Sequence, residues 1–472
     1  MVDLDPVATL WTAQEIAAAT GGVPDGDFSA TGVSIDTRSL EPGDLFVALA
    51  GVRDGHEFVD LAMSKSASGS LVTHRVPSPA VRVADTLAAL EALGVAARER
   101  APNARRGAVT GSVGKTSVTQ AVMAGLRRAG PAHSSVKSYN NHIGVPLTLA
   151  RMPRDTRRAV FEIGMNHANE IRPLTQMVRP HAVLVTTVGP VHTENFADGE
   201  LGVARAKAEI FEGLEPGGVA ILNADNSWFD LLKAEALRFG AEIRTFGSGT
   251  DCDARLIDFA VSGATAAVSM QWRGANLSFP IRQTAGHWGL NSMAVLLMLE
   301  ALGVGLDDSL AALGAFEPLA GRGAEATVRL GGGAFTLIDE SYNANPLSMA
   351  SAIATLGARR TGGRRIVALT DMLELGPEAD VFHATIAGPL ETASIDLVFC
   401  AGPLMKSLWD ALPPTRRGGY ADTASELAPR LADAVQAGDV VMVKGSNGSK
   451  AGLLAQALTA LGDPRTGLGE AG

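Results

Sequence analysis

The chain of 472 residues is longer than one hydrophobic core usually supports, so its length predicts about three domains. With 46% hydrophobic and 19% charged residues, the composition excludes an intrinsically disordered or collagen-like chain and predicts sizeable cores. The net charge is −10 and no dense run of lysine and arginine is present, which argues against nucleic acid or an anionic membrane as a partner.

The N-terminus and the cysteines indicate a cytoplasmic protein. The first residues carry neither a basic segment nor a long apolar one, and the longest apolar run, residues 294–299, is too short to span a bilayer. Cys252 and Cys400 lie far apart in apolar or mixed stretches, so neither a disulfide scaffold nor a zinc site is indicated. We expect no membrane insertion, and without an oligomerisation signal we expect a monomer.

Residues 1–85 are expected to form a small α/β domain. Between about residues 30 and 84, short apolar runs such as 45–49 and 69–72 alternate with turn-forming residues. Residues 85–101 then show apolar side chains at helical spacing. We place the first domain boundary before this helix.

Residues 86–313 are expected to form a central domain with a parallel sheet and helices on both faces. Its apolar runs are each followed by a loop with polar residues and then by an amphipathic pattern. The expected strands are 107–110, 159–164, 181–189 and 217–225. In such sheets ligands bind at the carboxyl ends of the strands.

The same alternation restarts in residues 314–472 and predicts a C-terminal, Rossmann-like, doubly wound domain. The expected strands are 335–339, 364–371, 397–402 and 439–445. Glycine and proline in residues 314–323 are suited to a hinge between the two larger domains. The predicted fold class is therefore α/β with three domains.

The strongest local signal is T-G-S-V-G-K-T at residues 110–116, between an expected strand and an expected helix at about 115–128. Val109 stands where the common Walker A loop has its first glycine, so this is the shorter T-G-x-x-G-K-[ST] form. The strand-loop-helix context favours a phosphate-binding loop over a structural turn.

The residue types of this loop suit the phosphates of a nucleotide. Gly111 and Gly114 let backbone N–H groups approach phosphate oxygens, and the helix N-terminus adds a favourable partial charge. Lys115 can reach a terminal phosphate, and Thr116 offers a hydroxyl to Mg²⁺.

Three further polar residues follow the later strands: Glu162, His192 and Lys207. Taken singly, they could be a solvated carboxylate, a loop histidine and an exposed helix cation. Near a nucleotide loop, however, a carboxylate and an imidazole can supply ligands to Mg²⁺, which prefers oxygen.

Several segments resemble those of the Mur ligase family, and the resemblance runs from the first module to the last strand. The segments are S-I-D-T-R-S-L-E-P-G-D-L-F-V-A-L-A-G-V-R-D-G-H-E-F (34–58), Y-N-N-H-I-G-V-P-L-T-L (139–149), G-H-W-G-L-N (286–291), A-G-R-G (320–323), D-E-S-Y-N-A-N-P (339–346), T-D-M-L-E-L-G (370–376) and K-G-S-N-G-S-K-A-G (444–452). Without the resemblance, segment 444–452 would be a flexible turn, and His287 and Asn291 would only share one face of a helix.

The segment D-E-S-Y-N-A-N-P discriminates among members of the family. It resembles the D-D-S-Y-N-A-N-P of the enzymes that add D-alanyl-D-alanine, with Glu340 in place of the second aspartate. Relatives that add meso-diaminopimelate carry D-N-P-R in the last domain, and folylpolyglutamate synthases carry D-G-A-H-N-P here. Neither motif is present in this sequence.

The resemblance implies roles for individual residues. It assigns to ATP the residues Gly111, Ser112, Val113, Gly114, Lys115, Thr116, Ser117, His287, Asn291, Arg322, Asp339, Tyr342 and Asn343. To the other substrates it assigns Ser34, Asp36, Arg38, Asp54, His56, Asn140, Asn141, Asn345, Lys444 and Ser446. It implies two Mg²⁺ ions held by Thr116, Glu162, His192 and Lys207, with Lys207 carbamylated by CO₂; the catalytic residues would be Lys115, Lys207, His192 and Glu162.

The activity that this resemblance implies is ATP-dependent addition of D-alanyl-D-alanine to a UDP-N-acetylmuramoyl-tripeptide, a step of peptidoglycan synthesis. Either meso-diaminopimelate or L-lysine fits as the third residue of the tripeptide. One alternative is a nucleotide-hydrolysing switch protein that joins no substrates. Another is a ligase of the same fold for a different amino acid or a polyglutamate tail.

Overall fold

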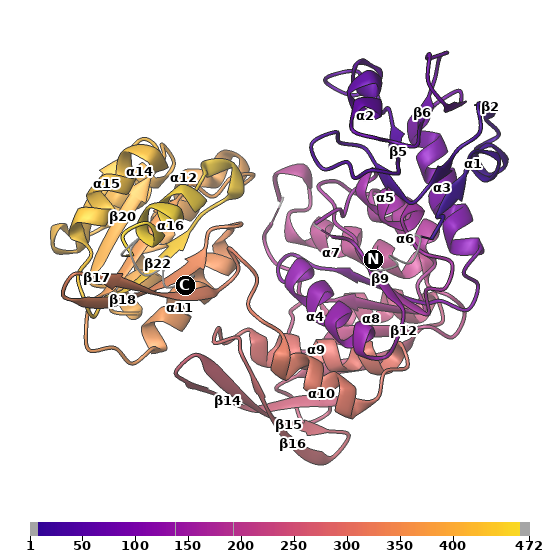
Figure 1. Cartoon of the computed structure of the whole chain (residues 1–472). Helices are drawn as coiled ribbons and strands as arrows, with labels where there is room; N and C mark the ends of the chain where they lie inside the picture. The colour runs from indigo at the N-terminus through magenta and orange to yellow at the C-terminus, as the bar shows by residue number, and fades with distance from the viewer. Residues whose placement is uncertain (1–7, 137, 192, 463–472) are drawn as a thin grey trace, which may run out of the picture.

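A computed structural model describes residues 8–136, 138–191 and 193–462, and it confirms the three-domain α/β fold (Figure 1). Within these residues, the three larger sheets occupy residues 23–82, 105–281 and 324–444, and we call them and their covering helices the N-terminal, central and C-terminal domains. A two-stranded sheet, β1 (Trp11–Thr12) with β3 (Ser29–Ala30), adds to the first. No helix of the described part is long and apolar enough to cross a membrane.

The N-terminal domain has a five-stranded sheet in the order β2-β7-β6-β5-β4, parallel except for β2 at its edge. Its helices are short because the connections between these strands are short. The elements are α1 (Ala13–Thr20), β2 (Val23–Asp25), β4 (Gly32–Ser34), β5 (Asp44–Val47), α2 (Val59–Ser64), β6 (Gly69–Val72) and β7 (Ala80–Arg82).

The central domain has a nine-stranded sheet in the order β16-β15-β14-β13-β12-β11-β8-β10-β9, with apolar residues on both faces. Its parallel strands are β8 (Arg105–Thr110), β9 (Ala132–Ser134), β10 (Arg158–Glu162), β11 (Ala182–Val185), β12 (Val219–Asn223), β13 (Glu242–Gly247) and β14 (Ala254–Ser262). The antiparallel strands β15 (Thr265–Trp272) and β16 (Ala275–Ile281), which were not predicted, extend the sheet at one edge.

Helices cover both faces of the central sheet, as predicted. The core on one face includes α4 and α9, and the core on the other includes α5 to α8. The helices are α4 (Lys115–Arg128), α5 (Gly144–Ala150), α6 (Ile171–Val178), α7 (Glu200–Ala208), α8 (Phe229–Arg238), α9 (Trp288–Ala301) and α10 (Leu306–Ala315).

The C-terminal domain is doubly wound, with a six-stranded sheet in the order β17-β18-β22-β19-β20-β21. Only β17 is antiparallel, and apolar cores lie on both faces. The strands are β17 (Ala324–Leu330), β18 (Gly333–Glu340), β19 (Arg365–Thr370), β20 (Leu397–Ala401), β21 (Arg417–Ala421) and β22 (Val440–Lys444); the helices are α11 (Pro346–Ala358), α12 (Ala379–Thr385), α13 (Ala387–Thr392), α14 (Met405–Ala411), α15 (Ala424–Ala434) and α16 (Gly452–Thr459).

Helix α3 (Thr86–Glu99) joins the first two domains. Its apolar face contributes Leu90, Leu93 and Ala97 to a core that also holds residues of β5 and of α5. Beside it, Trp11 Nε1 donates a hydrogen bond to Ala150 O at 2.8 Å, and the Arg100 guanidinium lies 3.6 Å from the centre of the Trp11 ring. Because α3 packs against elements on both sides, the boundary at residue 85 stays a prediction.

Replacing Leu93 by alanine tests the role of α3. The side chain is fully buried, and we expect the loss to lower the free energy of unfolding by about 2–5 kcal/mol, since a cavity would open in the shared core. Leu237→Ala is the control, because Leu237 is 54% exposed and its loss should cost less than about 0.5 kcal/mol. Urea titration followed by circular dichroism measures both; equal midpoints would contradict the shared core.

Candidate active site

A cavity of about 370 Å³ opens between the central and the C-terminal domains. On the central side, its lining comes from the phosphate loop, from the carboxyl ends of β10, β11 and β12, and from the start of α9. On the C-terminal side, it comes from the segment before β17, from the end of β18 and the segment that follows it, and from the end of β22. Predicted site residues in the lining are Ser112, Val113, Gly114, Lys115, Thr116, Ser117, Asn140, Glu162, His287, Asn291, Arg322, Tyr342, Asn343, Asn345 and Lys444.

The predicted phosphate loop has the expected strand-loop-helix form, with α4 beginning at Lys115. Gly111 and Gly114 have φ angles of +148° and +84°, which side chains rarely allow. A Cβ at Gly111 would also collide with Oγ1 of Thr186. That hydroxyl donates to Val113 O at 2.6 Å, so the neighbouring strand β11 braces the loop.

The backbone of the loop holds the side chain of Lys115, at the start of α4, through a hydrogen bond. Lys115 Nζ donates to Gly111 O at 2.8 Å, which curls the side chain over the loop. Burial lowers the pKa of Lys115, while the nearby Glu162 carboxylate opposes that shift. A cation in this position complements an anion bound to the N–H groups of the loop.

Glu162 is the last residue of β10, and only one of its two carboxylate oxygens accepts a hydrogen bond among the described residues. The residue is 2% exposed, and its Oε1 accepts a hydrogen bond from Asn140 Nδ2 at 2.7 Å. Its Oε2 is buried without a hydrogen-bond partner among the described residues. An unpartnered buried carboxylate oxygen is costly in a folded protein unless a cation or a donor completes it.

Lys207, near the end of α7, is 2% exposed. Burial, together with the charge of Lys115, holds the pKa of Lys207 well below its ordinary value, so the neutral amine is favoured. His192, predicted to lie near it, falls outside the described residues. In the described part of the chain, no three His, Cys, Asp or Glu residues are grouped so that they could hold a metal ion by themselves.

Segments far apart in the sequence meet at the hydroxyl of Thr116. Arg322, on the C-terminal side, donates to Thr116 Oγ1 at 3.1 Å and lies 3.9 Å from the ring centre of Tyr342. Tyr342 Oη donates to Ser138 Oγ at 3.2 Å, and Ser138 Oγ lies 2.9 Å from Thr116 Oγ1. Sequence reasoning missed Ser138, although it directly precedes the quoted segment 139–149.

The strand β18 brings Glu340 into the cavity lining beside the predicted residues of the C-terminal side. Asp339, its neighbour, instead accepts the backbone N–H of Ser341 at 3.0 Å and orders the turn. Lys444 Nζ donates to Asn343 O at 3.0 Å and to Glu340 at 3.5 Å, which holds the following loop in place.

Ser446 and Asn345 lie at a second hollow next to the main cavity. It measures about 320 Å³ and its lining also includes Val191 and Glu374. Ser446 Oγ accepts the N–H of Leu373 at 3.0 Å, so this serine orders the predicted segment 370–376. Asn141 likewise orders the loop before α5, because its Oδ1 accepts the N–H of Gly144 at 2.9 Å.

The five predicted residues of the N-terminal domain form a separate group at the carboxyl ends of β4 and β5. Asp36 and Arg38 pair through two nitrogens, with Arg38 Nη2 at 2.6 Å from Asp36 Oδ2. His56 Nδ1 lies 2.6 Å from Asp54 Oδ1, and Ser34 Oγ donates to Asp36 O at 3.2 Å. The structure therefore joins Ser34 with Asp36 and Arg38, and Asp54 with His56, and none of the five lines the cavity at the phosphate loop.

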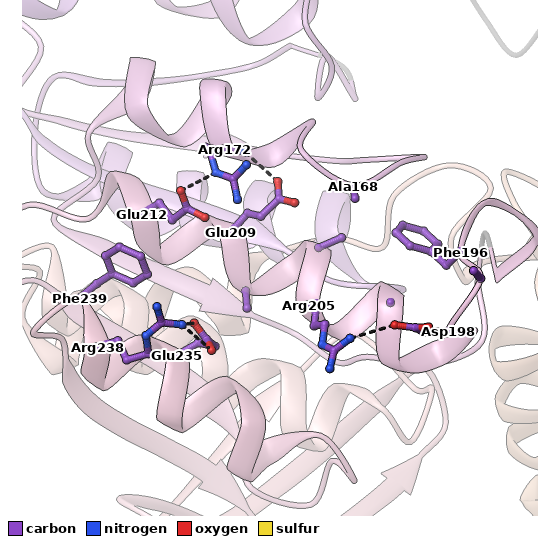
Figure 2. Close-up of a pocket in the computed structure, with 14 residues that line it drawn as sticks. Ala168, Arg172, Phe196, Asp198, Arg205, Glu209, Glu212, Glu235, Arg238 and Phe239 are labelled. Carbon is purple, nitrogen blue, oxygen red and sulfur yellow. Dashed lines mark hydrogen bonds and ion pairs between the residues drawn. The ribbon is translucent and has the colours of Figure 1, made fainter.

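A further hollow of about 530 Å³ lies on the outer helix layer of the central domain (Figure 2). Its three arginines already have carboxylate partners: Arg172 with Glu212, Arg205 with Asp198 and Arg238 with Glu235. An anionic ligand would have to displace these carboxylates, so the cavity with the phosphate loop is the stronger candidate for the active site.

Comparisons with known proteins agree with this geometry. Residues 109–299 match the Mur ligase middle domain, and residues 327–447 match the Mur ligase, glutamate ligase domain. The chain belongs to the Mur ligase family.

Relatives within the Mur ligase family cover nearly the whole chain. The UDP-N-acetylmuramoyl-tripeptide--D-alanyl-D-alanine ligase of Escherichia coli (strain K12) is 34% identical over 387 residues, which are 81% of this chain and 83% of the relative. The ligase of the same name from Bacillus subtilis (strain 168) is 32% identical and covers 89% and 91%. A crystal structure of MurF from Acinetobacter baumannii superposes with a TM-score of 0.84 at 26% identity, covering 97% of this chain and 100% of the other.

Gly111→Ala tests the loop as the anion site of this Mur ligase. The added methyl group collides with Thr186, so we expect the affinity for ATP with Mg²⁺ to fall roughly tenfold or more. Gly130→Ala is the matched control, because its φ of +124° is also unfavourable for a side chain but its Cβ would meet no atom within 4 Å. Isothermal titration calorimetry measures both; an unchanged affinity in Gly111→Ala would contradict the assignment.

Proposed function

We propose that this chain is an ATP-dependent ligase that joins D-alanyl-D-alanine to UDP-N-acetylmuramoyl-tripeptide, with release of ADP and phosphate. The observation that carries the proposal is the cavity in which the phosphate loop of the central domain faces the D-E-S-Y-N-A-N-P loop of the C-terminal domain. The names of the relatives in Escherichia coli and Bacillus subtilis support it.

The chemistry proceeds in two steps. The terminal carboxylate of the tripeptide attacks the γ-phosphorus of ATP, which forms an acyl phosphate and releases ADP. The amine of D-alanyl-D-alanine then attacks the acyl carbon, which forms the amide and releases phosphate and a proton. The protein places these groups and neutralises charge: Lys115 and the N–H groups at the start of α4 face the phosphates.

The residues present fit Mg²⁺. The unpartnered Oε2 of Glu162 and the hydroxyl of Thr116 are oxygen ligands on the cavity wall, and they would hold one ion. His192 and a carbamate on Lys207 would serve a second. When bound, such ions neutralise the negative charge of the phosphates.

The lowered pKa of Lys207 supports its carbamylation. The neutral amine attacks CO₂ and forms an N–C bond with loss of a proton, and burial already disfavours the ammonium. The carbamate is an anion, so it removes the repulsion from Lys115 and supplies the oxygen ligand that an ammonium cannot.

The product would be the pentapeptide precursor of peptidoglycan. This places the chain in cell wall biogenesis, on which cell shape, the cell cycle and cell division depend, and in the cytoplasm, where ATP and nucleotide-linked precursors are available. ATP would sit between the two larger domains, and the UDP group would lie at the N-terminal residues Ser34, Asp36, Arg38, Asp54 and His56.

Phosphate release from Mg-ATP tests the proposal. With UDP-N-acetylmuramoyl-tripeptide present, we expect release with D-alanyl-D-alanine, and far less with L-alanyl-L-alanine or no dipeptide, because only the correct amine consumes the acyl phosphate. Mass spectrometry should show the pentapeptide product. Release that is indifferent to both substrates would favour a nucleotide-hydrolysing switch.

Lys207→Ala tests the carbamate. We expect ligation to fall to background, since the buried anion would be lost, and small carboxylic acids added to the variant should restore part of the rate. Lys233→Ala, on the surface helix α8, is the control and should keep full activity. Full activity of the Lys207 variant would rule out the carbamate.

A further inference from the structure

The hydroxyl of Ser138 stands between the phosphate loop and the C-terminal domain. The residue lies in the loop between β9 and α5, where its Oγ is 2.9 Å from Thr116 Oγ1 and accepts a hydrogen bond from Tyr342 Oη at 3.2 Å. Tyr342 and Ser138 are 204 residues apart in the sequence. The serine therefore links two domains at the hydroxyl that the phosphate loop directs into the cavity.

Arg322 makes the second link to the same hydroxyl. Its Nη2 donates to Thr116 Oγ1 at 3.1 Å, and its guanidinium stacks on the Tyr342 ring at 3.9 Å. Both side chains come from the C-terminal side of the cavity and contact each other. Thr116 is thus hydrogen-bonded to the C-terminal domain directly, through Arg322, and indirectly, through Ser138 and Tyr342.

Counting protons and lone pairs shows which direction of the bond between Thr116 and Ser138 leaves Thr116 able to bind a cation. A hydroxyl has one proton to donate and two lone pairs that accept. If Ser138 donated to Thr116, the lone pairs of Thr116 would both be taken, by Ser138 and by Arg322, and its oxygen could not bind a cation. If Thr116 donates to Ser138, one of its lone pairs stays available.

Tyr342 and Thr116 can donate to Ser138 at the same time. Ser138 then accepts on both lone pairs, and its own proton is left for the nucleotide or for solvent. The tyrosine belongs to the C-terminal domain and takes one acceptor site of Ser138 where that domain lies against the central one. Docking therefore restrains the rotation of the Ser138 hydroxyl next to Thr116.

We propose that Ser138 is a positioning residue that couples docking of the C-terminal domain to the orientation of the Thr116 hydroxyl toward Mg²⁺. This inference rests on the proposed function, because it takes the cavity as the site of Mg-ATP. It adds a residue to that site and assigns it a role in assembly. The serine does not touch the reacting atoms.

The chain offers a matched set of variants. Ser138→Ala removes the link, Ser138→Thr keeps a hydroxyl, and Tyr342→Phe removes only the Oη while the ring under Arg322 remains. Ser135→Ala is the control from the same loop, because Ser135 Oγ is buried without a hydrogen-bond partner among the described residues. Thermal melts followed by circular dichroism verify that each variant is folded.

Two measurements separate positioning from structure. In Ser138→Ala we expect kcat to fall roughly five- to tenfold while KM for the tripeptide substrate stays unchanged, which is the effect of losing about one hydrogen bond in the assembled site. The Mg²⁺ concentration that half-saturates ATP binding, measured by calorimetry, should rise by a similar factor. Ser138→Thr and Ser135→Ala should match the wild type in both measurements.

A double-mutant cycle completes the test. Because Tyr342 acts through Ser138, the variant with both Ser138→Ala and Tyr342→Phe should be no slower than the slower single variant. Effects that multiply, or a Ser138→Ala variant identical to Ser135→Ala, would overturn the inference. If the wild type bound Mg-ATP but ligated nothing, the proposed function would fail, and the Mg²⁺ dependence of ATP binding would still decide the role of Ser138.

Discussion

The active site depends on the burial of two lysines, Lys115 and Lys207, and on one carboxylate, Glu162, near Lys115. A buried charge is costly unless it is paired; burial lowers the pKa of both lysines, and Glu162 opposes that shift only at Lys115. In addition, Oε2 of Glu162 is buried and has no hydrogen-bond donor among the described residues. The site is therefore electrostatically incomplete without its ligands. In the proposed function, phosphates would complement Lys115, a divalent cation would complement Glu162, and carbamylation would turn the amine of Lys207 into a metal ligand.

A parallel sheet suits such a site because it gathers polar residues at one edge while apolar residues fill both faces. The strands β8, β10 and β11 are neighbours, so the phosphate loop, Glu162 and Thr186 follow three adjacent strand ends. Close approach then imposes its own requirement: Gly111 lies against Thr186, which leaves no room for a side chain. The central sheet thus sets the positions of these side chains.

Signals that lie within one strand-loop-helix unit could be predicted from the sequence, whereas signals that need distant segments could not. The helix at residues 115–128 was predicted because its glycine-lysine start and its apolar spacing agree, and α4 spans those residues. The strands β15 and β16 were missed because they form a partly exposed hairpin that carries no site residue. Ser138 was missed because a lone serine is common, and its role depends on Tyr342, which lies far along the chain. Successive side chains of β18 point to opposite faces, so Glu340 lines the cavity while Asp339 accepts the N–H of Ser341. The role of Asp339 in binding ATP stays a prediction.

The two outer domains are attached to the central domain through different kinds of contact. The N-terminal domain shares an apolar core with α3 and α5 and is further held by Trp11 and Arg100. Around the cavity, the C-terminal domain makes single hydrogen bonds to the central one, including those at Thr116, Ser138 and from Thr284 to Glu325. Each such bond contributes only about 1 kcal/mol net. Substrates that touch both domains can therefore shift the population toward docking, and the release of products can reverse it. Water would be excluded from the acyl phosphate only while all partners are present, which protects the intermediate without trapping the product.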